Sequence, residues 1–131
     1  MKNYIGIDGL VLCVMGGKID VKRWISSIDM FDHSIISYEE LINSVNNLLN
    51  GELILRKNNK LVLSKQAKQI LRGGWRMGCI EWQLTVQKRI CRYFYDETKP
   101  RLFDLPQEEY DTALKKYRDE TEKTIARLSK Y

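Results

Sequence analysis

Residues 37–64 read SYEELINSVNNLLNGELILRKNNKLVLS, and this stretch predicts a helix, a stop and a β-hairpin in that order. Ser37 and Glu40 have the spacing of a capping box, in which the serine accepts a hydrogen bond from the Glu40 amide and the glutamate reaches back. Asn50-Gly51 ends the helix. The apolar residues between these ends recur at helical spacing: Leu41, Ile42, Val45, Leu48 and Leu49.

The hairpin is predicted from two short apolar runs, 53–57 and 60–63, which flank Asn58-Asn59. Asparagine tolerates a positive φ, so this pair suits a two-residue turn. Ser64 then has the position of a helix cap, and a short helix follows with Ala67, Ile70 and Leu71 on its apolar side. Gly73-Gly74 closes that helix.

Two helices are predicted before this stretch. Residues 7–15 carry apolar side chains at helical spacing, and Gly16-Gly17 stops the helix. Asp20 caps the second helix, which runs to about Phe31. Its predicted apolar face consists of Val21, Trp24, Ile25, Ile28 and Phe31.

Two longer helices are predicted after it. One runs from Trp75 to about Phe94 and is apolar on more than one side, which is typical of a helix buried against several neighbours. The other begins after Asp104, with Pro106 near its first turn. Its apolar stripe is narrow, closer to a packing seam than to a core face, and consists of Tyr110, Leu114, Tyr117, Ile125 and Leu128.

The order helix, helix, helix, hairpin, helix resembles the winged helix of small bacterial proteins. The residues that carry the resemblance are Tyr38-Glu39-Glu40-Leu41, then Val45-x-x-Leu48-Leu49-x-Gly51-x-Leu53-Ile54, then Leu61-Val62-Leu63-Ser64. We therefore expect an α+β, mostly α-helical fold in one compact domain. Residues 1–74 form the winged-helix-like core, and residues 75–131 form a helical extension that packs on the core or serves as a dimer arm. The resemblance implies DNA binding, with residues 38–49 as recognition helix and the hairpin as wing.

The charge is distributed unevenly along the chain. Residues 1–55 carry four Lys or Arg against seven Asp or Glu, residues 56–101 carry twelve against three, and residues 102–131 carry six against seven. The central segment therefore has a net charge of +9, within a chain total of +5. A concentrated basic region is what contacts with nucleic-acid phosphates require.

The candidate phosphate contacts are the cations of the wing and of the helix after it: Arg56, Lys57, Lys60, Lys65 and Lys68. Amide side chains on residues 38–49 can hydrogen-bond adenine edges from a major groove, and these are Asn43, Asn46 and Asn47. Glu39 and Glu40 oppose this interpretation, because carboxylates in the first turn repel phosphates. The alternatives are a solvated turn for the wing cations and an ordinary polar surface for the asparagines.

No catalytic residue, metal site or cofactor is predicted. The chain has one histidine, His33, and no glycine-rich phosphate loop. Cys13, Cys79 and Cys91 lack the close spacing of zinc ligands. No apolar run approaches the roughly 20 residues of a membrane span, so we expect a cytoplasmic protein without a membrane partner.

Two functions remain open at this stage. One is a winged-helix DNA-binding protein acting in transcription regulation, as a homodimer through its C-terminal helices. The other is a protein–protein interaction module, such as a toxin-neutralising or adaptor protein, that uses the same scaffold without DNA. The position of the basic segment relative to the asparagine face of residues 38–49 discriminates between them.

Overall fold

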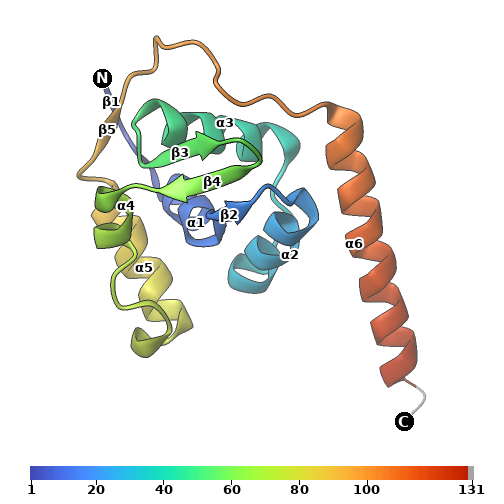
Figure 1. The fold of residues 1–131 in the computed structure, drawn as a ribbon. Coiled ribbons are helices and arrows are strands. Elements are labelled where there is room, and N and C mark those ends of the chain that lie inside the picture. Colours follow the sequence, from blue (N-terminus) through green and yellow to red (C-terminus); the bar gives the residue numbers. More distant parts are fainter. Residues whose placement is uncertain (130–131) are drawn as a thin grey trace.

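The computed structural model describes residues 1–129, apart from the side chain of Trp75, as a mostly helical α+β fold (Figure 1). The predicted extension to residue 131 thus ends two residues outside the described part. The helices are α1 (Gly6–Val14), α2 (Val21–Asp32), α3 (Tyr38–Asn50), α4 (Lys65–Ile70), α5 (Cys79–Ile90) and α6 (Gln107–Leu128), with a 3-10 helix at Gly74–Met77. The strands are β1 (Lys2–Asn3), β2 (Gly17–Lys18), β3 (Ile54–Lys57), β4 (Lys60–Leu63) and β5 (Phe94–Tyr95).

The three predicted helix caps are present. Asp20 accepts from the Arg23 amide, and Ser37 and Ser64 each accept from the amide three residues later. The hairpin has the predicted two-residue loop, with Asn58 at a φ of 56°. The second half of the capping box differs from the prediction, because the Glu40 carboxylate accepts from the Ser37 hydroxyl at 3.0 Å.

Three two-residue strands were not predicted: β2 extends the hairpin, and β1 and β5 pair with each other. β2 pairs with β4, so the sheet has the order β2-β4-β3. β1 pairs with β5, which brings the N-terminus to the segment after α5. Two-residue strands carry too little periodicity to be recognised, and their backbone partners lie far away in the sequence.

The prediction of one helix from Trp75 to about Phe94 is wrong at both ends. Gly78 has a φ of 86°, which separates the 3-10 helix from α5. α5 ends at Ile90, and Phe94 already belongs to β5. The helix also buries one side alone: Trp82, Val86 and Ile90 are in the core, whereas Ile80 and Leu84 are exposed.

The core is centred on α1. α1 packs against α5 and α3, and its residues 10–12 are almost completely buried. The sheet covers this core with Ile54 and Leu61, while α2 contributes Trp24, Ile25 and Ile28. The Trp82 indole donates to the Leu71 carbonyl at 3.0 Å and so joins α5 to the end of α4.

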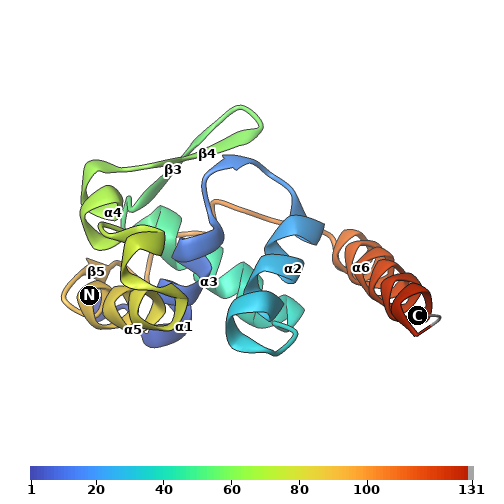
Figure 2. The ribbon, with the colours of Figure 1, turned by 90° about the horizontal axis from the view of Figure 1, so that it is seen from below.

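α6 lies at the side of the body, against α2 (Figure 2). An extended segment after β5 crosses α3 and leads into α6 (Figure 1). The Tyr38 hydroxyl donates to the Leu105 carbonyl, and the Tyr110 hydroxyl donates to the Ile36 carbonyl. These bonds fasten the start of α6 to the loop between α2 and α3.

Within residues 1–129, no helix is both long enough and apolar enough to cross a membrane.

Candidate nucleic-acid interface

Three lysines stand side by side across the sheet. The strand register pairs Lys18 with Lys60 and Lys60 with Lys57, so their side chains lie on the same face. Residues alternate between faces along a strand, and the neighbouring Leu61 is buried on the inner face. The three lysines, here called the lysine rung, therefore lie on the outer face at the hairpin tip, where all three are exposed.

Local contacts hold Lys18 in this position. The Ile19 amide donates to the Asn59 carbonyl at 3.0 Å, which ties the end of β2 to the hairpin loop. The Arg23 guanidinium donates to the carbonyls of Gly16 (3.1 Å) and Lys18 (3.3 Å). Arg23 is thus a structural cation, and it fixes the backbone that presents the first lysine of the rung.

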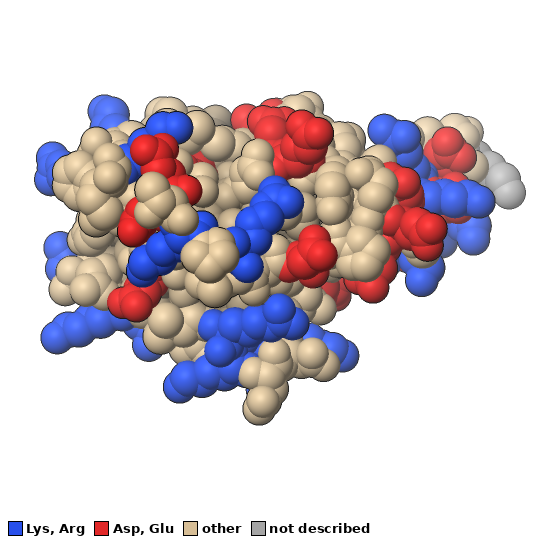
Figure 3. Space-filling model, turned by 90° about the horizontal axis from the view of Figure 1, so that it is seen from above, with Lys and Arg blue, Asp and Glu red and all other residues tan. Residues whose placement is uncertain are grey.

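The lysine rung has no neutralising partner in the part of the chain that the structure describes. The ion pairs of residues 1–129 join Lys2 to Glu97 and Lys22 to Glu120, and neither involves the rung. Like charges directly opposite on adjacent strands are destabilising. Figure 3 shows Lys and Arg gathered on the hairpin, which projects at the lower edge of that view.

Arg56 points the other way. It pairs with Leu61 in the sheet, so it lies on the inner face, and its guanidinium carbon lies 5.6 Å from the centroid of the Phe103 ring. Its Nε donates to the Asn58 carbonyl at 3.4 Å. Arg56 is exposed, but its side chain contacts Phe103 on the inner face. It is therefore a hairpin cation that is not part of the lysine rung.

Lys65 and Lys68 are exposed on α4, as expected of surface cations. The rung lies at the start of β4, whereas α4 follows the end of that strand at Leu63. A four-residue strand spans roughly 10 Å or more. The structure therefore keeps these two lysines apart from the rung.

The predicted asparagine face of α3 is covered. Asn46 is buried, and its side-chain oxygen accepts from the amides of Leu102 (2.8 Å) and Phe103 (2.9 Å). Its Nδ2 donates to the carbonyls of Ile42 (2.9 Å) and Phe103 (2.8 Å). All the polar atoms of this side chain are thus used inside the protein, and its interpretation as a polar surface residue is wrong.

The covering segment, residues 101–105, is here called the strap. Phe103 and Leu105 are buried, and the Phe103 ring centroid lies 6.0 Å from that of Trp24. Arg101 donates to the side-chain oxygen of Asn43 at 2.8 Å. Asn43 is exposed, whereas Asn47 is half-buried and donates to Asp8 at 3.5 Å. The structure therefore does not gather the three asparagines on one open face.

What α3 leaves fully open is narrow and acidic. Its exposed positions are Glu39, Glu40 and Asn43, while the remaining residues are half-buried or buried. A recognition helix needs an open face to enter a major groove. The strap occupies the place that such a groove would need.

A groove of about 690 Å³ borders the lysine rung on the side of α6. It lies between the start of α2 and the first turns of α6, and Lys18 and Lys22 form part of one wall. Glu108 and Glu109 stand on the α6 side. Asp20 and Lys116 also line the groove, so its three lysines and three carboxylates balance, in contrast to the unpaired lysines of the rung.

Asp8, which accepts from Asn47, is a buried carboxyl whose titration can be measured. Its Oδ2 accepts from the Ile5 amide at 3.0 Å, and burial raises its pKa above the ordinary 3.8 despite this bond. Because the folded-state pKa lies above the unfolded one, this group contributes stability below pH 3.8 that is lost as the pH rises through the folded pKa. We expect the unfolding free energy of Asp8→Asn, minus that of the unmodified chain, to increase with pH across this window.

Urea unfolding of both chains between pH 4 and 8 measures this difference, because the other titrating groups cancel. A difference that stays constant, or that decreases with pH, contradicts the raised pKa.

Sequence reasoning missed Lys18 and the strap. The charge count assigned Lys18 to the acidic segment 1–55. It could not show that Lys18 lies beside the hairpin lysines, because these are about forty residues away in the chain. No local signal marks residues 101–105 as a cover for α3. No known protein family, curated protein or solved structure matches this chain.

Proposed function

We propose that this chain is a winged-helix-like domain that binds the phosphate backbone of nucleic acid through the outer face of its hairpin. Two features support the scaffold. The three helices, hairpin and short helix follow in the order that the resemblance implies, and β2 widens the hairpin to three strands. The hairpin projects from the body, which leaves its outer face accessible (Figure 2).

The observation that carries the proposal is the unneutralised lysine rung. Lys18, Lys60 and Lys57 are adjacent and exposed, and no carboxylate of residues 1–129 forms an ion pair with any of them. Three neighbouring ammonium groups repel one another in the free protein. A row of phosphates relieves this repulsion and releases the counterions of the nucleic acid, which supplies binding free energy.

The proposed mode is independent of base sequence. Phosphate contacts position a protein on nucleic acid, whereas base-edge contacts specify a sequence. The strap covers the α3 face that would contact base edges, and the Asn46 side chain is hydrogen-bonded to the strap backbone. Binding is therefore expected to depend steeply on salt and weakly on sequence.

The experiment is fluorescence polarisation with a labelled random duplex at low and at physiological salt. Replacing the rung with Lys18→Gln, Lys57→Gln and Lys60→Gln together is expected to reduce the slope of log K against log salt by about 2.7, since each phosphate contact contributes about 0.9. The unfolding free energy is not expected to fall, because the change removes like-charge neighbours.

The matched control changes the same charge elsewhere. Lys115→Gln, Lys116→Gln and Lys123→Gln remove three exposed cations from α6. A rung-specific interface predicts that this triple variant keeps most of the salt slope. Equal losses in the two variants, or no binding to the duplex even at low salt, contradict the proposal.

A protein-binding module is the second candidate, and the covered α3 face favours it. With the asparagines closed off by the strap, the open part of α3 presents Glu39 and Glu40. That acidic strip suits a partner with a basic surface. If the duplex does not bind, the test is a pull-down with this chain as bait. A protein that the unmodified chain captures, and that the double variant Glu39→Lys with Glu40→Lys does not capture, supports this candidate.

A further inference from the structure

The second half of α6 buries none of its side chains against the described part of the chain, and its ion pair there joins Glu120 to Lys22. Every residue from Arg118 to Ser129 is exposed, including Ile125 (61%) and Leu128 (66%). The helix runs past the end of α2 and away from the body (Figure 1). A helix of fewer than about 12–15 residues is marginal in water on its own, because helices in proteins are stabilised mainly by packing.

The same apolar stripe continues through both halves of α6. Tyr110 is buried and Leu114 and Tyr117 are half-buried, so the first half uses this stripe for packing. Continuing at intervals of three and four residues, the stripe reaches Thr121, Thr124 and Leu128, with Ile125 beside it. These are the seam positions of a coiled coil.

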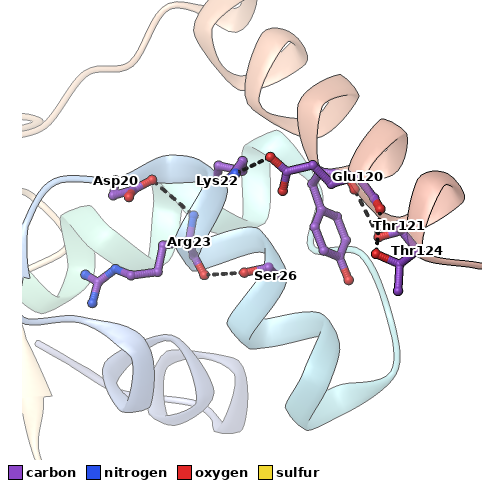
Figure 4. A network of polar contacts seen from close by, with 8 residues as sticks. Asp20, Lys22, Arg23, Ser26, Glu120, Thr121 and Thr124 are labelled. Carbon is purple, nitrogen blue, oxygen red and sulfur yellow. Dashed lines mark hydrogen bonds and ion pairs between the residues drawn. The ribbon is translucent and has the colours of Figure 1, made fainter. Parts of the chain in front are cut away.

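An open groove accompanies the exposed part of the seam. It has a volume of about 310 Å³ and is lined by Ser26 and Lys22 of α2 and by Tyr117, Glu120, Thr121, Thr124 and Ile125 of α6. Lys22 pairs with Glu120 at 2.6 Å, and the Tyr117 hydroxyl donates to Asp29. Figure 4 shows Lys22 and Ser26 on α2 facing Glu120, Thr121 and Thr124 on α6, where the two helices diverge.

We propose that residues 118–128 of α6 pair antiparallel with the same segment of a second copy of this chain. Glu120 and Arg127 are seven residues apart, so both flank the seam on the same side. In the antiparallel arrangement, Glu120 of each copy faces Arg127 of the other, and two complementary pairs form. In an in-register parallel pair, Glu120 faces the apolar Ile125 instead, and this complementarity is lost.

The antiparallel register also fills the seam. With Glu120 opposite Arg127, Thr121 of one copy lies in the same layer as Thr124 of the other. Leu128 then packs beside Tyr117 of the second copy, at the groove between α2 and α6. The pairing does not depend on nucleic-acid binding, and it is tested without nucleic acid.

Sedimentation equilibrium of the full chain is the first experiment. We expect a dimer that the double variant Ile125→Glu with Leu128→Glu weakens at least tenfold. The matched control is Ile80→Glu with Leu84→Glu, which changes two similarly exposed apolar residues on α5 (74% and 54%). A chain that is monomeric at its highest soluble concentration overturns the proposal, and so does equal weakening by both double variants.

Charge reversal tests the register. Glu120→Arg and Arg127→Glu are each expected to weaken the homodimer, because each places like charges opposite one another. An equimolar mixture of the two single variants is expected to form a heterodimer, since both cross-pairs are then complementary. Lys115→Gln, which removes an exposed cation of α6 outside the seam, is expected to leave dimerisation unchanged. A mixture that stays as weak as its components overturns the antiparallel pairing.

Discussion

Replacing Asn46 with alanine is expected to lower the free energy of unfolding by about 3 kcal/mol or more, because it leaves buried backbone groups without partners. The Asn46 amide satisfies the N–H and the C=O of Phe103 and the N–H of Leu102. Phe103 is buried, so water does not replace the two bonds of its backbone without disrupting the strap. Urea unfolding measures the loss, and hydrogen exchange at the Phe103 amide locates it.

Asn43→Ala is the matched control. Asn43 lies on the same helix and also contacts the strap, but its single bond to Arg101 is exposed at 2.8 Å. Exposed polar contacts contribute little, so a change within about 0.5 kcal/mol is expected. Equal effects of the two substitutions would mean that the strap is not anchored through Asn46.

Replacing Gly51 with alanine is expected to cost roughly 3 kcal/mol, at the upper end of the usual range for overpacking a core. A Cβ at this position would lie 1.8 Å from the Tyr4 hydroxyl oxygen, 2.8 Å from its Cζ and 3.0 Å from the Phe94 carbonyl oxygen. Tyr4 is almost completely buried, and its hydroxyl donates to the Asn47 carbonyl at 2.8 Å. A shift of the ring away from the added Cβ would therefore break this buried hydrogen bond.

Gly6→Ala is the control for the glycine-to-alanine change itself. The nearest atom to a Cβ at Gly6 is the Gln87 side-chain oxygen at 3.5 Å, an ordinary contact. We expect this variant to be as stable as the unmodified chain or more stable by up to about 1 kcal/mol. Tyr4→Phe in the Gly51→Ala background is expected to recover part of the loss by removing the closest atom. If Gly51→Ala alone is neutral, the close approach of Tyr4 is contradicted.

The elements of the fold that sequence alone predicted are those with short-range signals. Ser37, Ser64 and Asp20 cap their helices through amides three residues away, and Asn58-Asn59 closes a loop between adjacent strands. Each signal and its effect lie within a few residues, so no knowledge of the tertiary structure is needed. The same holds for the general basic character of the hairpin.

At Gly51 the local sequence predicts the correct end of α3 but not the full reason why glycine is needed there. The sequence predicts a helix end there, and α3 does end at Asn50. Its φ is −86°, however, and the left-handed residue is Glu52, at 60°. Glycine is needed because Tyr4, forty-seven positions earlier, lies against it. No pattern in residues 37–64 contains that information.

The residues of the candidate site also differ in whether local sequence or tertiary structure determines their position. The sequence by itself determined that Lys57 and Lys60 flank a tight turn and are therefore close together on one face. Only the tertiary structure brought Lys18 beside them, through the pairing of β2 with β4, and only it buried Asn46 under the strap. The physical reason is that burial and cross-strand pairing depend on which distant segment arrives at a surface. A polar residue such as Asn46 has the same local sequence signature whether it faces water or the backbone of residues 102–103.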